Sequence, residues 1–285
     1  MADLLLAEPA RLAVVGAAGQ AGAATLHAEE LARLCPRLRA MDAQVVGGGA
    51  PRDSLPTVQR RADVARFGNQ RAVEFHPTLM PPSFGEQTDV LGGTVTHLVL
   101  DLDPPEGSGF DEVVAVAQLA RTALDAAGLA SAVKTSGSKG LHVVVPVRDI
   151  ALSDAAAATR ALAARTAALD EKIATTAYLK ADRGGRVFVD STRAGGGSLA
   201  CAFSPRIRPG TPVSYPVPWS DLNAVSPRDF TIRSVLPLPK DDPWRALLPS
   251  PQPVPADVIA EGHEIPIARV VAMHEGKRRK RATES

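Results

Sequence analysis

The segment HLVLDLD, residues 97–103, is a hydrophobic stretch that ends in two aspartates. Its three central apolar residues predict a strand that is buried on both faces. Asp101 and Asp103 are two residues apart, so on a strand their side chains point to the same face. Neighbouring carboxylates repel each other, and oxygen ligands of this kind favour Mg²⁺ or Mn²⁺. The segment therefore predicts either a metal-binding strand end or a pair of solvated aspartates.

A glycine-containing segment, KTSGSKGLHVVV at residues 134–145, predicts two strands joined by a tight turn. Gly137 and Gly140 would allow positive φ angles and leave backbone N–H groups exposed. Together with Ser136, Lys139 and His142, such amides would suit a bound phosphate chain. The alternative is an ordinary hairpin with a solvated lysine.

Asp190 ends a further predicted strand, GRVFVD at residues 185–190. A single aspartate at a strand end is usually structural. Together with Asp101 and Asp103, however, it could hold two metal ions. Such a pair aligns an attacking hydroxyl with a leaving pyrophosphate.

Two predicted helices separate these strands. The first, residues 110–129, has Asp111 near its start and Gly128 near its end; the second, residues 153–174, has Ser153 as its candidate N-cap. The order is strand, helix, hairpin, helix, strand. It predicts an α+β fold in which helices cover one face of a mainly antiparallel sheet.

The composition excludes several classes of protein. The net charge of +1 gives no overall attraction to nucleic acid, so any such binding needs a local patch. The two cysteines, Cys35 and Cys201, are far apart, and no zinc-ligand spacing is present. The N-terminus lacks the positive charge of a signal peptide, and no apolar run could span a bilayer. We therefore expect a cytoplasmic protein with no membrane association.

The acidic strand ends and the glycine-containing hairpin occur in an order that resembles the archaeo-eukaryotic primase superfamily. More narrowly, the chain resembles the polymerase domain of the bacterial end-joining ligase D and its stand-alone primase-polymerase relatives. The matching segments are LVLDLDPPEG, VKTSGSKGLHVVVPV, RVFVD, FSPRIRPGTPVSYPVPWSDL and PRDFTIRSVLPLPKDDPW. The resemblance implies an archaeo-eukaryotic-primase-like core with an RRM-like sheet.

The resemblance also implies an activity and a set of site residues. Such enzymes extend a primer strand on DNA with NTPs or dNTPs in end joining, with Mn²⁺ or Mg²⁺ at a two-metal site. Possible partners are Ku and a separate ligase, at the nucleoid. The matching metal-binding carboxylates are Asp101, Asp103 and Asp190, and the matching nucleotide-binding residues are His76, Ser136, Lys139, His142 and Arg206.

The chain departs from the family pattern in places. Residues 1–60 contain no lysine and no phenylalanine, residue types with which relatives stack on the template and hold a 5′-phosphate. Arg193 and Ala194 stand where relatives commonly have Gln-Asn. We expect a shortened, divergent region over residues 1–60, including an amphipathic helix over 25–41. A primase-polymerase core over 61–245 and a proline-rich segment with a basic tail over 246–285 would follow.

Other functions are compatible with parts of the pattern. A phosphatase of the haloacid-dehalogenase type also has a strand that ends in Asp-x-Asp, but Pro104 does not suit that family. A degenerate, non-catalytic module that holds DNA ends would explain the missing N-terminal features. The glycines of VVGAAGQAG, residues 14–22, weakly resemble a dinucleotide-binding loop, and a loop of small residues is the stronger interpretation.

Overall fold

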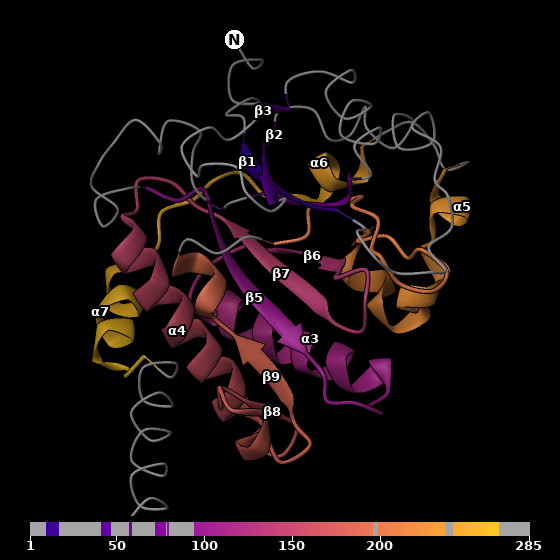
Figure 1. Ribbon diagram of the computed structural model, residues 1–285. Helices are drawn as coiled ribbons and strands as arrows, with labels where there is room; N and C mark the ends of the chain where they lie inside the picture. The colour runs from indigo at the N-terminus through magenta and orange to yellow at the C-terminus, as the bar shows by residue number, and fades with distance from the viewer. Residues whose placement is uncertain are drawn as a thin grey trace, which may run out of the picture.

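The structure is a computed structural model of the 285-residue chain. It describes residues 10–16, 41–46, 57–58, 72–77, 79, 94–195, 199–236 and 242–267. Two β-sheets and a set of helices make up the described part (Figure 1). Residues 25–40 of the predicted helix and the basic tail lie outside the described residues, and Met41 begins a strand.

The larger sheet has six strands in the order β10-β6-β7-β5-β9-β8. All its strand pairs are antiparallel except β8 with β9. The strands are β5 (His97–Asp103), β6 (Ala132–Thr135), β7 (Leu141–Pro146), β8 (Ala174–Thr175), β9 (Val187–Asp190) and β10 (Pro216–Val217). The prediction of a mainly antiparallel sheet is confirmed, including the hairpin of β6 and β7. The sequence did not predict β8 or β10, which are only two residues long.

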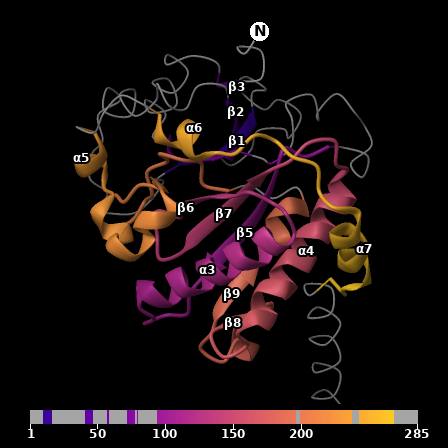
Figure 2. The same ribbon diagram turned by 180° about the vertical axis from the view of Figure 1, so that it is seen from behind.

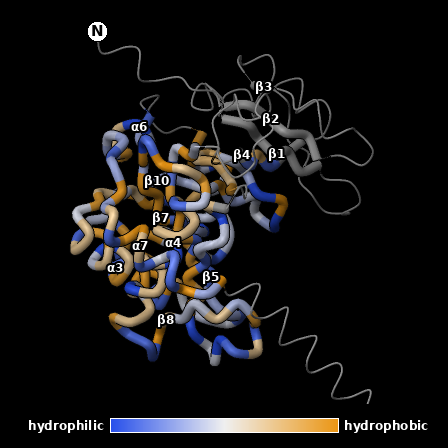
Figure 3. The backbone as a smooth tube through the Cα atoms, turned by 90° about the vertical axis from the view of Figure 1, so that its left-hand side faces the viewer, coloured by the Kyte–Doolittle hydropathy of each residue, from blue (hydrophilic) through white to orange (hydrophobic). Residues whose placement is uncertain are grey.

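Helices α3 (Phe110–Ala126) and α4 (Leu152–Leu169) cover one face of this sheet, as predicted (Figure 2). Alternate residues of β5, namely Leu98, Leu100 and Leu102, are buried in the core shared with these helices. Val99 belongs to a separate cluster on the opposite face. Asp101 and Asp103 have the same parity as Val99, so both aspartates lie on the face without α3 and α4. Hydrophobic segments gather inside the molecule around β7 and β10 (Figure 3).

The start of α4 differs from the prediction. The helix begins at Leu152 with Ala151 as its N-cap, and no side chain caps it. Ala151 pairs with Thr94 in a β-bridge, which keeps the chain extended up to this residue. Ser153 therefore lies inside the first turn and is not the N-cap. At the end of α3, Gly128 has a φ of 70°, as a residue that terminates a helix often does.

The smaller sheet has the order β3-β2-β1-β4. Its strands are β1 (Ala10–Gly16), β2 (Met41–Val46), β3 (Thr57–Val58) and β4 (Ala72–Pro77). β1 pairs in parallel with β2 and antiparallel with β4. The first three strands were not predicted, because this stretch was interpreted as weakly specified. Residues 17–22 of the glycine-containing segment VVGAAGQAG lie outside the described residues.

Short elements also lie around the larger sheet. One of them, η3 (Lys180–Asp182), lies between β8 and β9. The chain after β9 forms η4 (Thr192–Gly195), η5 (Trp219–Ala224), η6 (Pro227–Asp229), α5 (Ile232–Val235), α6 (Pro243–Leu247) and α7 (Ala256–Glu264). Of these, α7 packs along α4 (Figures 1 and 2). The contact is close at Gly262, where an added Cβ would lie 1.8 Å from the Ala157 carbonyl oxygen. Across the described ranges, no helix combines the length and apolar character needed to cross a bilayer.

Candidate active site

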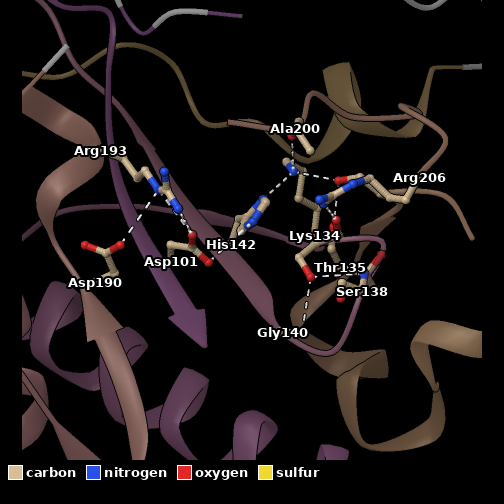
Figure 4. A network of polar contacts seen from close by, with 12 residues as sticks. Asp101, Lys134, Thr135, Ser138, Gly140, His142, Asp190, Arg193, Ala200 and Arg206 are labelled. Carbon is tan, nitrogen blue, oxygen red and sulfur yellow. Dashed lines mark hydrogen bonds and ion pairs between the residues drawn. The ribbon is translucent and has the colours of Figure 1, made fainter. Parts of the chain in front are cut away.

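Four polar residues lie side by side across the face of the larger sheet that lacks α3 and α4. Lys134 on β6 pairs in register with His142 on β7, His142 with Asp101 on β5, and Asp101 with Asp190 on β9. Residues in register on adjacent strands point to the same face. The strand pairing therefore builds a continuous row of charged and polar side chains, which we call the cross-strand row (Figure 4).

The acidic end of the cross-strand row is held by an arginine. Arg193, on η4, places Nη2 3.1 Å from Asp101 Oδ2 and Nε 3.8 Å from Asp190 Oδ2. The backbone amide of Thr192 donates to Asp190 Oδ1 at 2.8 Å. One guanidinium thus faces both carboxylates and partly offsets their mutual repulsion.

Burial and neighbouring acids perturb Asp101. The pKa of the Asp101 carboxyl is raised to about 6. Burial is the main cause, and the charges of Asp190 and Asp103 also raise the pKa, whereas Arg193 lowers it. These surroundings disfavour the ionised form of Asp101, so a cation bound beside it would stabilise the carboxylate. The donor set of two adjacent carboxylates consists of hard oxygens, which fit Mg²⁺ or Mn²⁺.

Asp103 stands somewhat apart from the other two aspartates. Its side chain is half exposed, and its Oδ2 lies 3.2 Å from Nη1 of Arg183. That guanidinium also stacks on Phe188, 3.9 Å from the ring centroid. Among the side chains that the structure describes, no three acidic, histidine or cysteine groups converge closely enough to hold a metal ion. Asp101 and Asp190 are therefore neighbours that share Arg193, whereas Asp103 pairs with Arg183.

The turn between β6 and β7 is organised around Ser136. Its Oγ accepts hydrogen bonds from the backbone amides of Ser138 and Gly140, both at 3.1 Å. Gly137 has a φ of 70°, as predicted. Gly140 does not have a positive φ; it is required because a Cβ there would lie 2.1 Å from the Leu102 carbonyl oxygen. The expectation that the turn leaves its amides free is thus wrong for Ser138 and Gly140.

The remaining predicted nucleotide-binding residues lie around this turn. Arg206 donates from Nη1 to the Ser136 carbonyl, and its Nε lies 3.2 Å from Glu74 Oε2. The same Glu74 oxygen is 3.0 Å from Nε2 of His76, so β4 brings His76 beside Arg206. Lys139 is half exposed, 4.0 Å from Glu106.

Glu74 links these groups, although the sequence analysis did not single it out. Burial would raise the pKa of its carboxyl, but the hydrogen bond with His76, the Ile207 amide and the Arg206 charge outweigh burial and lower it to about 2. Glu74 is therefore ionised at neutral pH and anchors Arg206 and His76.

A model of the family described as the LigD primase-polymerase domain matches residues 26–244. The chain belongs to the LigD primase-polymerase domain family. Among curated relatives, the multifunctional end-joining protein LigD of Pseudomonas aeruginosa is 32% identical over 199 residues, 66% of this chain and 23% of that protein. LigD of Mycobacterium bovis is 30% identical over 189 residues, 64% of this chain and 24% of that protein. The chain thus matches about a quarter of the length of these relatives.

A solved structure agrees with this assignment. The polymerase domain of Mycobacterium tuberculosis ligase D, in complex with DNA, matches with a TM-score of 0.56 and 29% identity. The match covers 66% of this chain and 68% of that one. The family and the antiparallel sheet do not support the phosphatase alternative.

Several residues that contact the predicted site residues of this LigD-family chain were not predicted from the sequence. Lys134, Arg183 and Glu74 were not identified, and Arg193 was noticed only as a departure from the family pattern. Lys134 could have been found, because it lies two residues before Ser136 on a strand that pairs with β7. Arg183 directly follows η3, Arg193 lies in η4 and Glu74 lies in β4, and no sequence spacing relates them to the acidic strand ends.

Proposed function

We propose that this protein is a template-directed nucleotidyltransferase that extends a primer 3′-hydroxyl with NTPs or dNTPs during DNA end joining. The observation that carries the proposal is the pairing of Asp101 with Asp190 on the sheet face without α3 and α4, the face from which the Ser136 turn continues. Acidic residues at one end and a basic, glycine-containing turn at the other suit a metal-bound triphosphate.

Some residues of the site would bind the metal ions, and others would bind the nucleotide. Asp101 and Asp190, with Asp103 nearby, would hold Mn²⁺ or Mg²⁺ in a two-metal site. When bound, the metals would activate the 3′-hydroxyl and neutralise the leaving pyrophosphate. Lys139 is exposed enough to reach a phosphate, and His142 faces Asp101 with Nε2 3.5 Å from Oδ1. Ser136 would shape the turn, while Arg206 and His76, both anchored by Glu74, would contact the nucleotide.

Broken or primed DNA is the proposed partner, because a ligase D polymerase domain of similar structure has been solved in complex with DNA. We further propose that the protein works at the nucleoid, in the cytoplasm, with end-joining proteins such as Ku and with a separate ligase. The three regions predicted from the sequence remain our proposal for its domain organisation.

A primer-extension assay tests the proposed activity. A labelled primer on a gapped DNA template is incubated with each NTP or dNTP and Mn²⁺ or Mg²⁺. We expect template-dependent addition by the wild-type chain and none by Asp190→Asn, which removes one charge but keeps the side-chain shape. Addition at the wild-type rate by Asp190→Asn would refute the assignment of the site.

A non-catalytic DNA-end-binding module is the second candidate. The observation that favours it is the pairing of the acidic residues with arginines, Arg193 with Asp101 and Arg183 with Asp103. DNA binding in a mobility-shift assay, without addition under any metal and nucleotide condition, would support this function over the first.

A further inference from the structure

Lys134 is a fully buried lysine in the cross-strand row, with 2% of its surface exposed. Lysine is almost never buried without partners, because removing an ammonium group from water is costly. Burial lowers the pKa of Lys134 to about 7, and the charge of Arg206 also lowers it. Because burying the Lys134 ammonium group costs free energy, we looked for its role in the site that it faces.

Three polar groups lie within hydrogen-bonding distance of the Lys134 ammonium. Its Nζ lies 2.7 Å from the Ala200 carbonyl oxygen, 2.6 Å from Ser214 Oγ and 2.6 Å from His142 Nδ1. A carbonyl can only accept. The Ser214 hydroxyl donates its own hydrogen to the Thr135 carbonyl at 2.7 Å, so towards Lys134 it also accepts. An ammonium group has three hydrogens and no lone pair, so at His142 Nδ1 it can only donate, and each partner takes one hydrogen.

This assignment fixes the state of His142. Because Nδ1 accepts from Lys134, the single proton of a neutral imidazole must be on Nε2. His142 is buried, and burial, together with the charges of Lys134, Arg206 and Arg193, lowers its pKa well below the usual value. Its Nε2 points along the cross-strand row towards Asp101, at 3.5 Å from Oδ1.

The nearby thiol does not supply a compensating charge. Burial raises the pKa of Cys201 to about 12, so this group is a neutral thiol at neutral pH. Of the described groups that raise the pKa of Lys134, this leaves Asp101 as the one that can carry a negative charge. Its carboxylate lies on the far side of His142 from Lys134. Lysine, imidazole and carboxylate therefore form one directed chain of contacts.

We propose that Lys134 is a positioning residue that holds His142 in its Nε2–H form, so that the imidazole presents a hydrogen-bond donor to the carboxylate and phosphate side of the site. This inference rests on the proposed function only for its kinetic consequence. The tautomer itself is a property of the folded chain.

Nitrogen NMR of the chain labelled with ¹⁵N in its histidine rings tests the tautomer directly. The spectra are recorded about one pH unit below the pKa of Lys134, where the ammonium form predominates. The His142 signals are assigned from a His142→Gln spectrum. We expect an unprotonated, hydrogen-bonded Nδ1 and a protonated Nε2 in the wild type, and a displaced Nδ1 signal in Lys134→Met. A protonated Nδ1 in the wild type, or unchanged His142 signals in Lys134→Met, would overturn the inference.

Kinetics then separate positioning from structure. Partners that orient a functional group cost about 10–100-fold when removed. Lys134→Met and His142→Gln should each lower nucleotide incorporation by about this factor, and the double variant should be no worse than either. Independent, multiplying losses would contradict the inference. If Lys134→Met fails to fold, the wild-type spectrum alone still tests the inference, because a protonated Nδ1 in that spectrum would overturn it. A wild-type chain without incorporation would refute the proposed function and leave the tautomer result intact.

Discussion

Replacing Asp101 by asparagine should make the metal-free protein more stable. Its pKa lies at about 6 in the folded chain against 3.8 for an unperturbed carboxyl. A folded pKa above the unfolded value means that stability is fully present below about pH 4 and falls as the pH rises through 6. The difference of about two pKa units corresponds to about 3 kcal/mol at pH 8. Asparagine has the same shape without the charge and should recover much of this free energy.

Urea and thermal unfolding in EDTA measure this effect. At pH 8 we expect the free energy of unfolding of Asp101→Asn to exceed that of the wild type by about 2–3 kcal/mol. For a chain of this size, that corresponds to a rise in Tm on the order of 5–10 °C. Near pH 4 the two chains should unfold alike, because the wild-type carboxyl is then largely protonated in the folded state.

Asp103→Asn is the matched control. This residue lies on the same strand and face, but its side chain is half exposed and paired with Arg183. Loss of such a pair changes stability by about 0–1 kcal/mol, so no stabilisation is expected. The reasoning fails if Asp101→Asn is no more stable than the wild type at pH 8, or if Asp103→Asn gains as much.

Three further variants test other contacts. Arg193→Gln removes the cation shared by the acidic pair, so Mn²⁺ should bind more tightly in a calorimetric titration; equal or weaker binding would contradict this. Gly262→Ala places a methyl group against the Ala157 carbonyl and should lower the free energy of unfolding by about 2 kcal/mol or more; no loss in urea melts would show that α7 can shift freely. Gly140→Ala meets the Leu102 carbonyl and should lower both stability and nucleotide incorporation; unchanged activity would argue against the turn geometry.

The alternation of residues along the strands made the main elements of the site predictable. Because residues two apart share a face, the sequence predicted Asp101 and Asp103 on the same face of β5, where they lie. The order of elements gave the antiparallel sheet and the face covered by α3 and α4. The pairing of Asp101 with Asp190 follows once β9 lies beside β5, but no feature of the sequence fixes that neighbour relation.

The partners of the site residues were not predictable, for physical reasons. Arg183 directly follows the 3₁₀ helix η3, and Arg193 lies in the 3₁₀ helix η4; the positions of both short helices depend on tertiary packing. Glu74 approaches from β4, which belongs to the smaller sheet. The strands of residues 10–16 and 41–46 were missed because the periodicity of a short apolar run does not distinguish a buried strand from a helix segment.

The central claim is that the cross-strand row and the adjacent turn form one metal–triphosphate site. Electron paramagnetic resonance of Mn²⁺ titrated into the chain with a non-hydrolysable ATP analogue tests it most directly. The account predicts tightly bound Mn²⁺ in the wild type and strongly weakened binding in Asp101→Asn and Asp190→Asn, while both variants stay folded. Equal Mn²⁺ binding by wild type and both variants would contradict it.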